Sequence, residues 1–227
     1  MAASGPRRRA ASRIPLAEAA GLIIPISDWL LEQVCAQKQQ RKKVYNRPFT
    51  VSVNMSPLHF RQANFIDDLA VLMERYEVAD ETLELEITEG MAMAGGEDIV
   101  RTLTELKAIG LGLAIDDFGT GYSSLSYLQK FPIDRLKIDK SFLDGVPDNP
   151  DSVAICEVII QLAQILGLGI VAEGVETEAQ VTFLSALGCD EAQGYYFARP
   201  LSPDALKSHF AAPVQEQDLR VSVPSAG

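Results

Sequence analysis

The stretch LGLAIDDFGTG, residues 111–121, joins a β-rich run to a glycine-rich turn. Neighbouring side chains on a strand point to opposite faces, so Asp116 and Asp117 can act in one site only if the chain turns beside them. The segment FGTG at 118–121 supplies that turn, because glycine adopts positive φ readily and lets backbone N–H groups approach an anion. The GTG triplet alone is a weak phosphate-binding signal, and the adjacent acidic pair gives it weight.

Outward from this stretch, β-rich runs alternate with segments of helical periodicity. The β-rich runs occupy residues 49–54, 83–88, 111–116, 135–139, 168–173 and 192–197. Apolar spacing of about 3.6 residues predicts helices over 97–109, 151–166 and 177–187, and two helices over 15–43 that meet near Ile24-Pro25. We expect Asp151 to be an N-cap and Gly110 a C-cap.

This alternation indicates right-handed βαβ units and one parallel sheet, so the fold class is α/β. Two architectures satisfy it, a doubly wound open sheet and a (β/α)₈ barrel. The barrel is favoured because polar residues stand at the ends of the strands, where the active site of a barrel enzyme lies. The β-rich runs account for six strands, so two strands of a full barrel are missing from the pattern.

Polar side chains stand near the end of every β-rich run, although a buried strand should be apolar. They are Asn54, Glu86, Glu89, Asp116, Asp117, Lys137, Asp139, Glu173, Glu176 and Gln193. Each alone has an ordinary explanation, since such a residue is usually solvated or caps the next helix. Together, clustered carboxylates repel one another unless a cation neutralises them, and hard oxygen ligands suit Mg²⁺ or Mn²⁺ rather than zinc.

The composition is that of a folded, acidic protein. The chain has 227 residues, 47% of them apolar, and 20 basic against 31 acidic residues give a formal charge of −11. This charge disfavours binding to DNA or to an anionic membrane, and a phosphodiester ligand would require metal ions. Scattered cysteines without a CxxC pair suit a reducing cytoplasm, and no apolar run is long enough to cross a membrane.

Composition shifts only near the two ends of the chain. The sequence predicts a disordered tail over 1–12, one domain over 13–211 and a second disordered tail over 212–227. The first tail has arginines but no apolar segment after them, so it is not a secretory signal.

Six motifs, in order, resemble those of the EAL domain of bacterial cyclic-di-GMP phosphodiesterases. They are NMS at 54–56, ELEITEG at 84–90, AIDDFGTGYSSLSYL at 114–128, LKIDKSF at 136–142, IVAEGVET at 170–177 and QGYYFARPL at 193–201. The segment IPLAEAAGLIIPISDWLL at 14–31 is similar to the family's first helical segment. The resemblance covers about residues 14–210, and DDFGTGYSSL with a later AEGVE and QGY is highly specific.

The resemblance implies a TIM-like barrel that hydrolyses cyclic-di-GMP to linear pGpG with two Mg²⁺ or Mn²⁺ ions. The positions that match metal ligands are Asn54, Glu86, Asp116, Asp117 and Glu173, with Asp117 bridging the ions. Those that match catalytic residues are Lys137, which orients the attacking water, Glu173 and Asp117. Those that match substrate or loop positions are Gln193, Glu89, Glu176, Gly119, Thr120 and Gly121, with Glu89 supporting the glycine-rich loop.

One departure concerns the family's Glu-Ala-Leu motif, which precedes the IPLAE-like segment. Here MAASGPRRRAASR stands in that place, so we expect an incomplete barrel whose first two strands are missing. The resemblance implies that a metal-binding glutamate and a substrate-contacting arginine are lost with these strands. This loss is serious, because removing even a residue that supports a metal ligand lowers metal affinity or activity by roughly 10–100-fold.

Three hypotheses follow. The chain is an active phosphodiesterase whose missing strands come from a homodimer partner, another complementing chain or an upstream frame. Alternatively, it is a catalytically impaired cyclic-di-GMP-binding or protein-interaction module, or a non-functional gene fragment. Retention of the metal-ligand positions and of Lys137 favours catalysis, since a receptor needs no water-orienting lysine.

Overall fold

The computed structural model describes residues 14–42, 49–80, 82–121, 125–202 and 205–206. The chain divides into two compact units, the first made of residues 1–87 with 104–112 and the second of 88–103 with 113–227. The expected tails at 1–12 and 212–227 lie outside the described residues.

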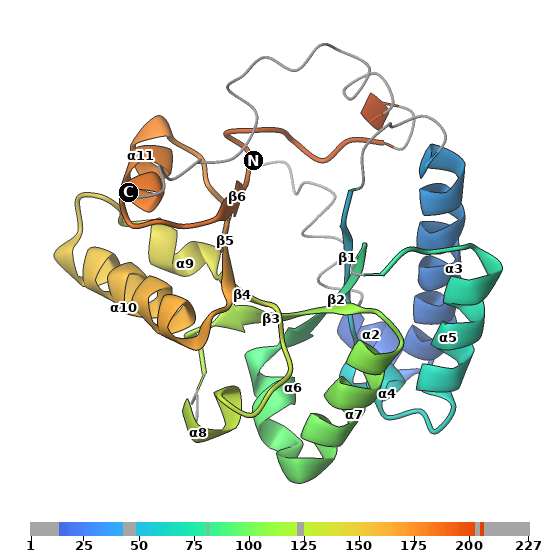
Figure 1. Cartoon of the computed structure of the whole chain (residues 1–227). Helices are drawn as coiled ribbons and strands as arrows, with labels where there is room; N and C mark the ends of the chain where they lie inside the picture. The colour runs from blue at the N-terminus through green and yellow to red at the C-terminus, as the bar shows by residue number, and fades with distance from the viewer. Residues whose placement is uncertain (1–13, 43–48, 81, 122–124, 203–204, 207–227) are drawn as a thin grey trace, which may run out of the picture. The chain divides into compact units, whose positions relative to one another are not determined.

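The first unit packs helices around two parallel strands (Figure 1). Its elements are α2 (Ile14–Ala19), α3 (Ile23–Lys42), β1 (Val51–Asn54), α4 (Pro57–Phe60), α5 (Phe65–Arg75) and β2 (Leu83–Thr88). β1 and β2 pair in register from Val51 opposite Leu83 to Asn54 opposite Glu86. Leu83, Leu85 and Ile87 of β2 are fully buried, so this strand forms part of the core.

The second unit continues the strand–helix alternation. Its elements are α6 (Glu89–Ala94), the beginning of α7 (Gly96–Ala108), β3 (Gly112–Phe118), α8 (Leu125–Leu128), β4 (Arg135–Ile138), α9 (Lys140–Leu143), α10 (Pro150–Leu166), β5 (Gly169–Glu173), α11 (Glu178–Ala186) and β6 (Glu191–Gln193). β3 to β6 pair in sequence order, each parallel to the next. α10 packs on β4 and β5, as Figure 1 shows.

The helix termini correct two expectations and confirm a third. Asn149, not Asp151, is the N-cap of α10, because its Oδ1 accepts the Asp151 N–H at 2.9 Å. The first two helices meet at Gly21, with φ +68°, rather than near Ile24-Pro25. Pro25 instead lies in the first turn of α3, where a missing N–H costs no hydrogen bond. Gly110 follows α7 with φ +88°, as expected.

The last expected strand, 192–197, is too long. β6 ends at Gln193, after which Gly194 lies against the backbone of Val175 so closely that a side chain would collide with it. The chain then forms a turn in which the N–H groups of Phe197 and Ala198 both donate to the Gly194 carbonyl, each at 3.2 Å. The apolar run YYF therefore belongs to a loop.

A buried lysine fixes the start of both strands in the first unit. Lys38 of α3 is buried, with 7% of its surface exposed, and its Nζ donates to the carbonyl oxygens of Phe49, at 2.8 Å, and of Thr82. These residues precede β1 and β2. The ammonium also lies 4.6 Å from the centroid of the Phe49 ring.

In the second unit, aspartates satisfy backbone groups where strands begin. Asp134, just before β4, accepts the Leu113 N–H of β3 at 2.8 Å. Asp190, just before β6, accepts the Ile170 N–H of β5 at the same distance, 2.8 Å. Each aspartate therefore links the start of one strand to the start of its neighbour.

Among the described helices, none combines the length and apolar composition that a membrane crossing needs.

Candidate metal centre

In the second unit, the carboxyl ends of the strands bring charged side chains together around a buried lysine. Lys137 of β4 is 3% exposed, and its Nζ lies 3.2 Å from Asp116 Oδ1 and also forms an ion pair with Glu173 Oε1. Gln193 Nε2 at the end of β6 donates to the same Glu173 carboxylate. Carboxylate oxygens of Asp116 and Glu173 lie within 4.8 Å of each other. Four neighbouring strands thus contribute to one cluster.

Asp117 joins this cluster because the backbone turns at the residue itself. Its φ is +54°, a left-handed conformation that non-glycine residues rarely adopt, and the register of β3 with β4 is irregular between Ile115 and Phe118. The sequence placed the turn one residue later. The Asp117 N–H donates to Asp116 Oδ1 at 3.0 Å, and Thr120 Oγ1 donates to the Asp117 carbonyl at 2.8 Å. The acidic pair is therefore held by its own turn.

The surroundings of Asp117 raise its pKa. Burial raises the pKa of Asp117 above its ordinary value, and the negative charges of Asp116, Asp139 and Glu173 raise it further, while Lys137 opposes them. Burial and the neighbouring carboxylates together thus outweigh the opposing effect of Lys137 on the pKa of Asp117. A divalent cation bound among these oxygens would relieve that repulsion.

Glu89 lies beside the cluster and supports the glycine-rich loop. It is 2% exposed at the start of α6, and its Oε2 accepts the N–H groups of Gly119 at 2.9 Å and Gly121 at 3.2 Å. A Cβ at Gly121 would lie 3.0 Å from Glu89 Oε1, so a larger residue here would crowd the carboxylate. Gly119 and Gly121 therefore direct their N–H groups to a carboxylate of the protein itself, not toward solvent.

Glu176 is separate from the cluster around Lys137. It forms an ion pair with Lys140, and both side chains are about half exposed. Lys140 was not among the expected site residues, because only the folded structure brings the residue after LKID next to EGVE.

In the first unit, Asn54 and Glu86 stand opposite each other at the ends of β1 and β2. Asn54 is exposed and Glu86 is buried. Two residues earlier, Ser52 Oγ donates to Glu84 Oε1 at 2.7 Å, and Glu84 is 3% exposed. The polar residues at the strand ends did not indicate this second pair, although the period-two alternation of a strand puts it on the same face as the first.

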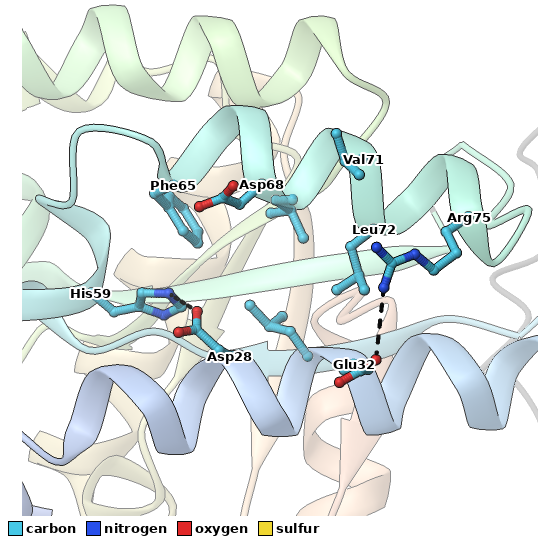
Figure 2. Close-up of a pocket in the computed structure, with 10 residues that line it drawn as sticks. Asp28, Glu32, His59, Phe65, Asp68, Val71, Leu72 and Arg75 are labelled. Atoms are coloured by element: carbon cyan, nitrogen blue, oxygen red, sulfur yellow. Dashed lines mark ion pairs between the residues drawn. The ribbon is translucent and has the colours of Figure 1, made fainter.

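A pocket in the first unit is lined by residues of α3, α4 and α5 (Figure 2). Two pairs of its polar side chains contact each other, as the dashed lines show: His59 Nε2 with Asp28 Oδ1 at 2.8 Å, and Arg75 Nη1 with Glu32 Oε1 at 3.9 Å. The other lining residues are mostly apolar. Among the described residues, its three acidic ones, Asp28, Glu32 and Asp68, do not belong to a carboxylate cluster that could hold a metal ion.

The donor set of the second unit fits a hard divalent cation. Asp116, Asp117 and Glu173 offer carboxylate oxygens, the ligands that Mg²⁺ and Mn²⁺ prefer. The three free cysteines, Cys35, Cys156 and Cys189, are all buried.

Comparison with known families identifies the chain. The EAL domain matches residues 4–200, and the chain belongs to this family. Among curated relatives, MucR of Pseudomonas aeruginosa, named a bifunctional diguanylate cyclase/cyclic di-GMP phosphodiesterase, is 40% identical over 87% of this chain and 29% of its own length. NbdA of the same organism, named a cyclic di-GMP phosphodiesterase, is 39% identical over 88% of this chain and 25% of its own length. The chain thus spans between a quarter and a third of these two relatives.

Solved structures show the same fold. The phosphodiesterase of MucR in complex with c-di-GMP matches with a TM-score of 0.83 and 40% identity, over 86% of this chain and 79% of that one. The EAL domain of Mycobacterium smegmatis DcpA matches with a TM-score of 0.79 and 36% identity, over 84% of this chain and 85% of that one. These matches confirm the expected EAL-type fold, an incomplete TIM-like barrel of parallel strands.

Proposed function

We propose that this chain is a cyclic-di-GMP phosphodiesterase domain that cleaves its substrate to linear pGpG. The observation that carries the proposal is the buried Lys137, paired with Asp116 and Glu173 beside an Asp117 whose pKa is raised. Membership of the EAL family and relatives that are named cyclic di-GMP phosphodiesterases support it. A hydrolase of a phosphodiester requires a means of activating water and neutralising phosphate, and this cluster contains the groups for both.

Two Mg²⁺ or Mn²⁺ ions would be held by the oxygen ligands at the strand ends. The proposed ligands are Asn54, Glu86, Asp116, Asp117 and Glu173, with Asp117 shared by both ions. When bound, such ions lower the pKa of a water molecule and neutralise the phosphate. They would also reconcile a formal charge of −11 with an anionic substrate.

Lys137 would orient the attacking water molecule. Its ammonium donates hydrogen bonds but cannot accept them, so a water molecule bound to it would point a lone pair at the lysine. Asp116 and Glu173 hold the ammonium in position. Water would attack phosphorus, the bond between phosphorus and the leaving sugar oxygen would break, and that oxygen would take up the proton that the attacking water releases. Gln193 supports this arrangement by donating to Glu173.

The test is to incubate the purified chain with cyclic-di-GMP and Mn²⁺ and to separate the products by chromatography. We expect linear pGpG, its loss on chelation, and its return when Mn²⁺ is added in excess. Asp117→Asn is the inactive variant, and Asp148→Asn, in an exposed turn, is its matched control.

Each alternative predicts a different outcome. Calorimetric binding of cyclic-di-GMP without product would identify a binding module. Failure both to bind and to cleave, even when the missing strands are supplied on a second chain, would identify a fragment without function. The homodimer and the complementing chain remain predictions, which light scattering of the purified chain would test.

A further inference from the structure

The segment that follows Glu173 is held in an unusual conformation. β5 ends at Glu173, and Gly174 turns the chain with φ +72°, a region that side chains disfavour. The side chain of Lys140 lies directly over this glycine, since a Cβ there would come within 2.6 Å of Lys140 Cγ and 2.7 Å of its Cβ. The aliphatic part of Lys140 thus occupies the space that a side chain at Gly174 would need.

The charged end of Lys140 binds the same segment at a second point. Its Nζ forms an ion pair with Glu176 Oε1, two residues beyond Gly174. Hydrogen bonding to Glu176 is also the main cause that raises the pKa of Lys140, so this ammonium stays charged. Lys140 therefore spans the loop from the β4 side, touching it through both its stem and its charge.

The other side of the loop is fixed by the backbone after β6. The Val175 N–H donates to the Gln193 carbonyl at 3.0 Å, and the Tyr196 N–H donates to the Val175 carbonyl at 3.0 Å. Val175 itself is fully buried. The loop is thus held by the backbone of β6, by Lys140 and by Gln180 Oε1, which accepts the Glu176 N–H at 2.8 Å, while Glu173 at its start contacts Lys137.

We propose that Lys140 is a positioning residue that, through its ion pair with Glu176, holds the Glu173 carboxylate against Lys137. This inference rests on the proposed function for its consequence in catalysis, but not for its structural content. Lys140 begins α9 three residues after Lys137, so the same short segment carries the buried lysine and the residue that restrains its carboxylate partner. Glu176 acts through Lys140 and does not belong to the carboxylates that bind the metal.

A double-mutant cycle separates the pair from its parts. Lys140→Met keeps the aliphatic stem and removes the charge, Glu176→Gln removes the other charge, and Lys140→Arg keeps both features. A half-exposed ion pair contributes modestly, so we expect Lys140→Met and Glu176→Gln each to raise the Mn²⁺ concentration needed for half-maximal binding by about three- to fivefold. The double variant should show the same defect as either single variant, because both remove one interaction. Lys140→Arg should restore near-normal binding.

Hydrogen exchange measures the loop without any turnover. We expect the Val175 and Glu176 amides to exchange about three- to fivefold faster in Lys140→Met, with the Leu168 amide, two residues after the end of α10, unchanged. If exchange and Mn²⁺ binding change together while no variant cleaves cyclic-di-GMP, the proposed function fails and the role of Lys140 stands. Additive defects, or loop exchange equal to that of the unmodified chain, would overturn the inference.

Discussion

The two ends of the strands differ in how their polar groups are satisfied. Where strands begin, Asp134 and Asp190 each accept a backbone N–H, and Lys38 donates to two carbonyl oxygens. Where strands end, Asp116 and Glu173 share one lysine, and Asp117 has a raised pKa. The first end pairs each charge with a dipole of the backbone, whereas the second gathers several carboxylates around one lysine.

This contrast separates stability from function in one sheet architecture. In barrels of parallel strands, catalytic groups lie at the carboxyl ends of the strands, and the opposite end contributes stability. Changes at the beginning of the strands should therefore lower the free energy of unfolding without altering the site. Changes at the end of the strands should abolish activity and, for some residues, increase stability.

The largest expected effect is that of Asp117→Asn. Losing a residue that only supports a metal ligand lowers metal affinity or activity by about 10–100-fold. Losing a metal ligand shared by both ions should therefore reduce kcat by roughly a thousandfold. The variant should nevertheless melt at a higher temperature than the unmodified chain at pH 7 without metal. When folding raises the pKa of a carboxyl group, the free energy of unfolding falls as the pH rises from the ordinary pKa through the raised pKa. Removing the charge of Asp117 should therefore stabilise the folded chain at pH 7. Turnover assays and thermal unfolding check the two halves.

Lys137→Met should come next. Removing the buried ammonium leaves Asp116 and Glu173 facing each other without a counter-charge, so the metal-free variant should be less stable. We expect a loss of about a hundredfold in kcat, because the lysine no longer orients water. Added Mn²⁺ should recover part of the lost thermal stability, measured by differential scanning fluorimetry. A variant as stable and active as the unmodified chain would contradict the assignment.

At the beginning of the strands, Asp134→Ala should affect stability alone. It leaves the buried Leu113 N–H without its 2.8 Å acceptor, which should cost about 1–3 kcal/mol in the free energy of unfolding. Asp134→Asn is the matched control, since its amide oxygen can still accept this hydrogen bond. Urea unfolding measures the cost, and Mn²⁺ binding of the folded variant should match that of the unmodified chain. A comparable loss in Asp134→Asn would point to charge instead of the hydrogen bond.

The smallest expected effect is a pH dependence from Lys38. Burial lowers its pKa from 10.5 to about 8, so the folded chain binds fewer protons than the unfolded chain between these values. Its contribution to stability should therefore rise as pH increases from 8 toward 10. The difference in unfolding free energy between the unmodified chain and Lys38→Met, measured at both ends of this window, isolates it. A difference that is constant or falls with pH would contradict this cause.

The strands and five of the ten helices in the described residues followed from sequence periodicity because burial imposes it, whereas α5 and the four short helices α4, α6, α8 and α9 were not predicted. The run 83–88 is observed as a strand at the same residues, and α10 differs from its expected span by one residue. The failures occur where a local hydrogen bond or a distant backbone decides. Asn149 competes successfully with Asp151 as a cap because Pro150 occupies the first helical position. The YYF run is apolar, but Gly194 lies against Val175 and ends β6 early.

The candidate site was predictable in its residue types and only partly in its contacts. Polar residues at strand ends revealed Asp116, Lys137, Glu173 and Gln193, which the second unit brings together. The sequence could not reveal that Asp117 itself adopts positive φ, since its neighbours Gly119 and Gly121 suggested a later turn. Nor could it reveal Lys140, whose partner Glu176 is 36 residues away and meets it only in the folded chain.

The most direct test of the account is calorimetric titration of the purified, metal-free chain with Mn²⁺, beside Asp117→Asn. We predict saturable binding by the unmodified chain and its loss in the variant, with Asp148→Asn behaving as the unmodified chain does. Equal binding by the unmodified chain and Asp117→Asn, or no binding by either folded protein, would contradict the claim that the carboxylates at the strand ends form a metal centre.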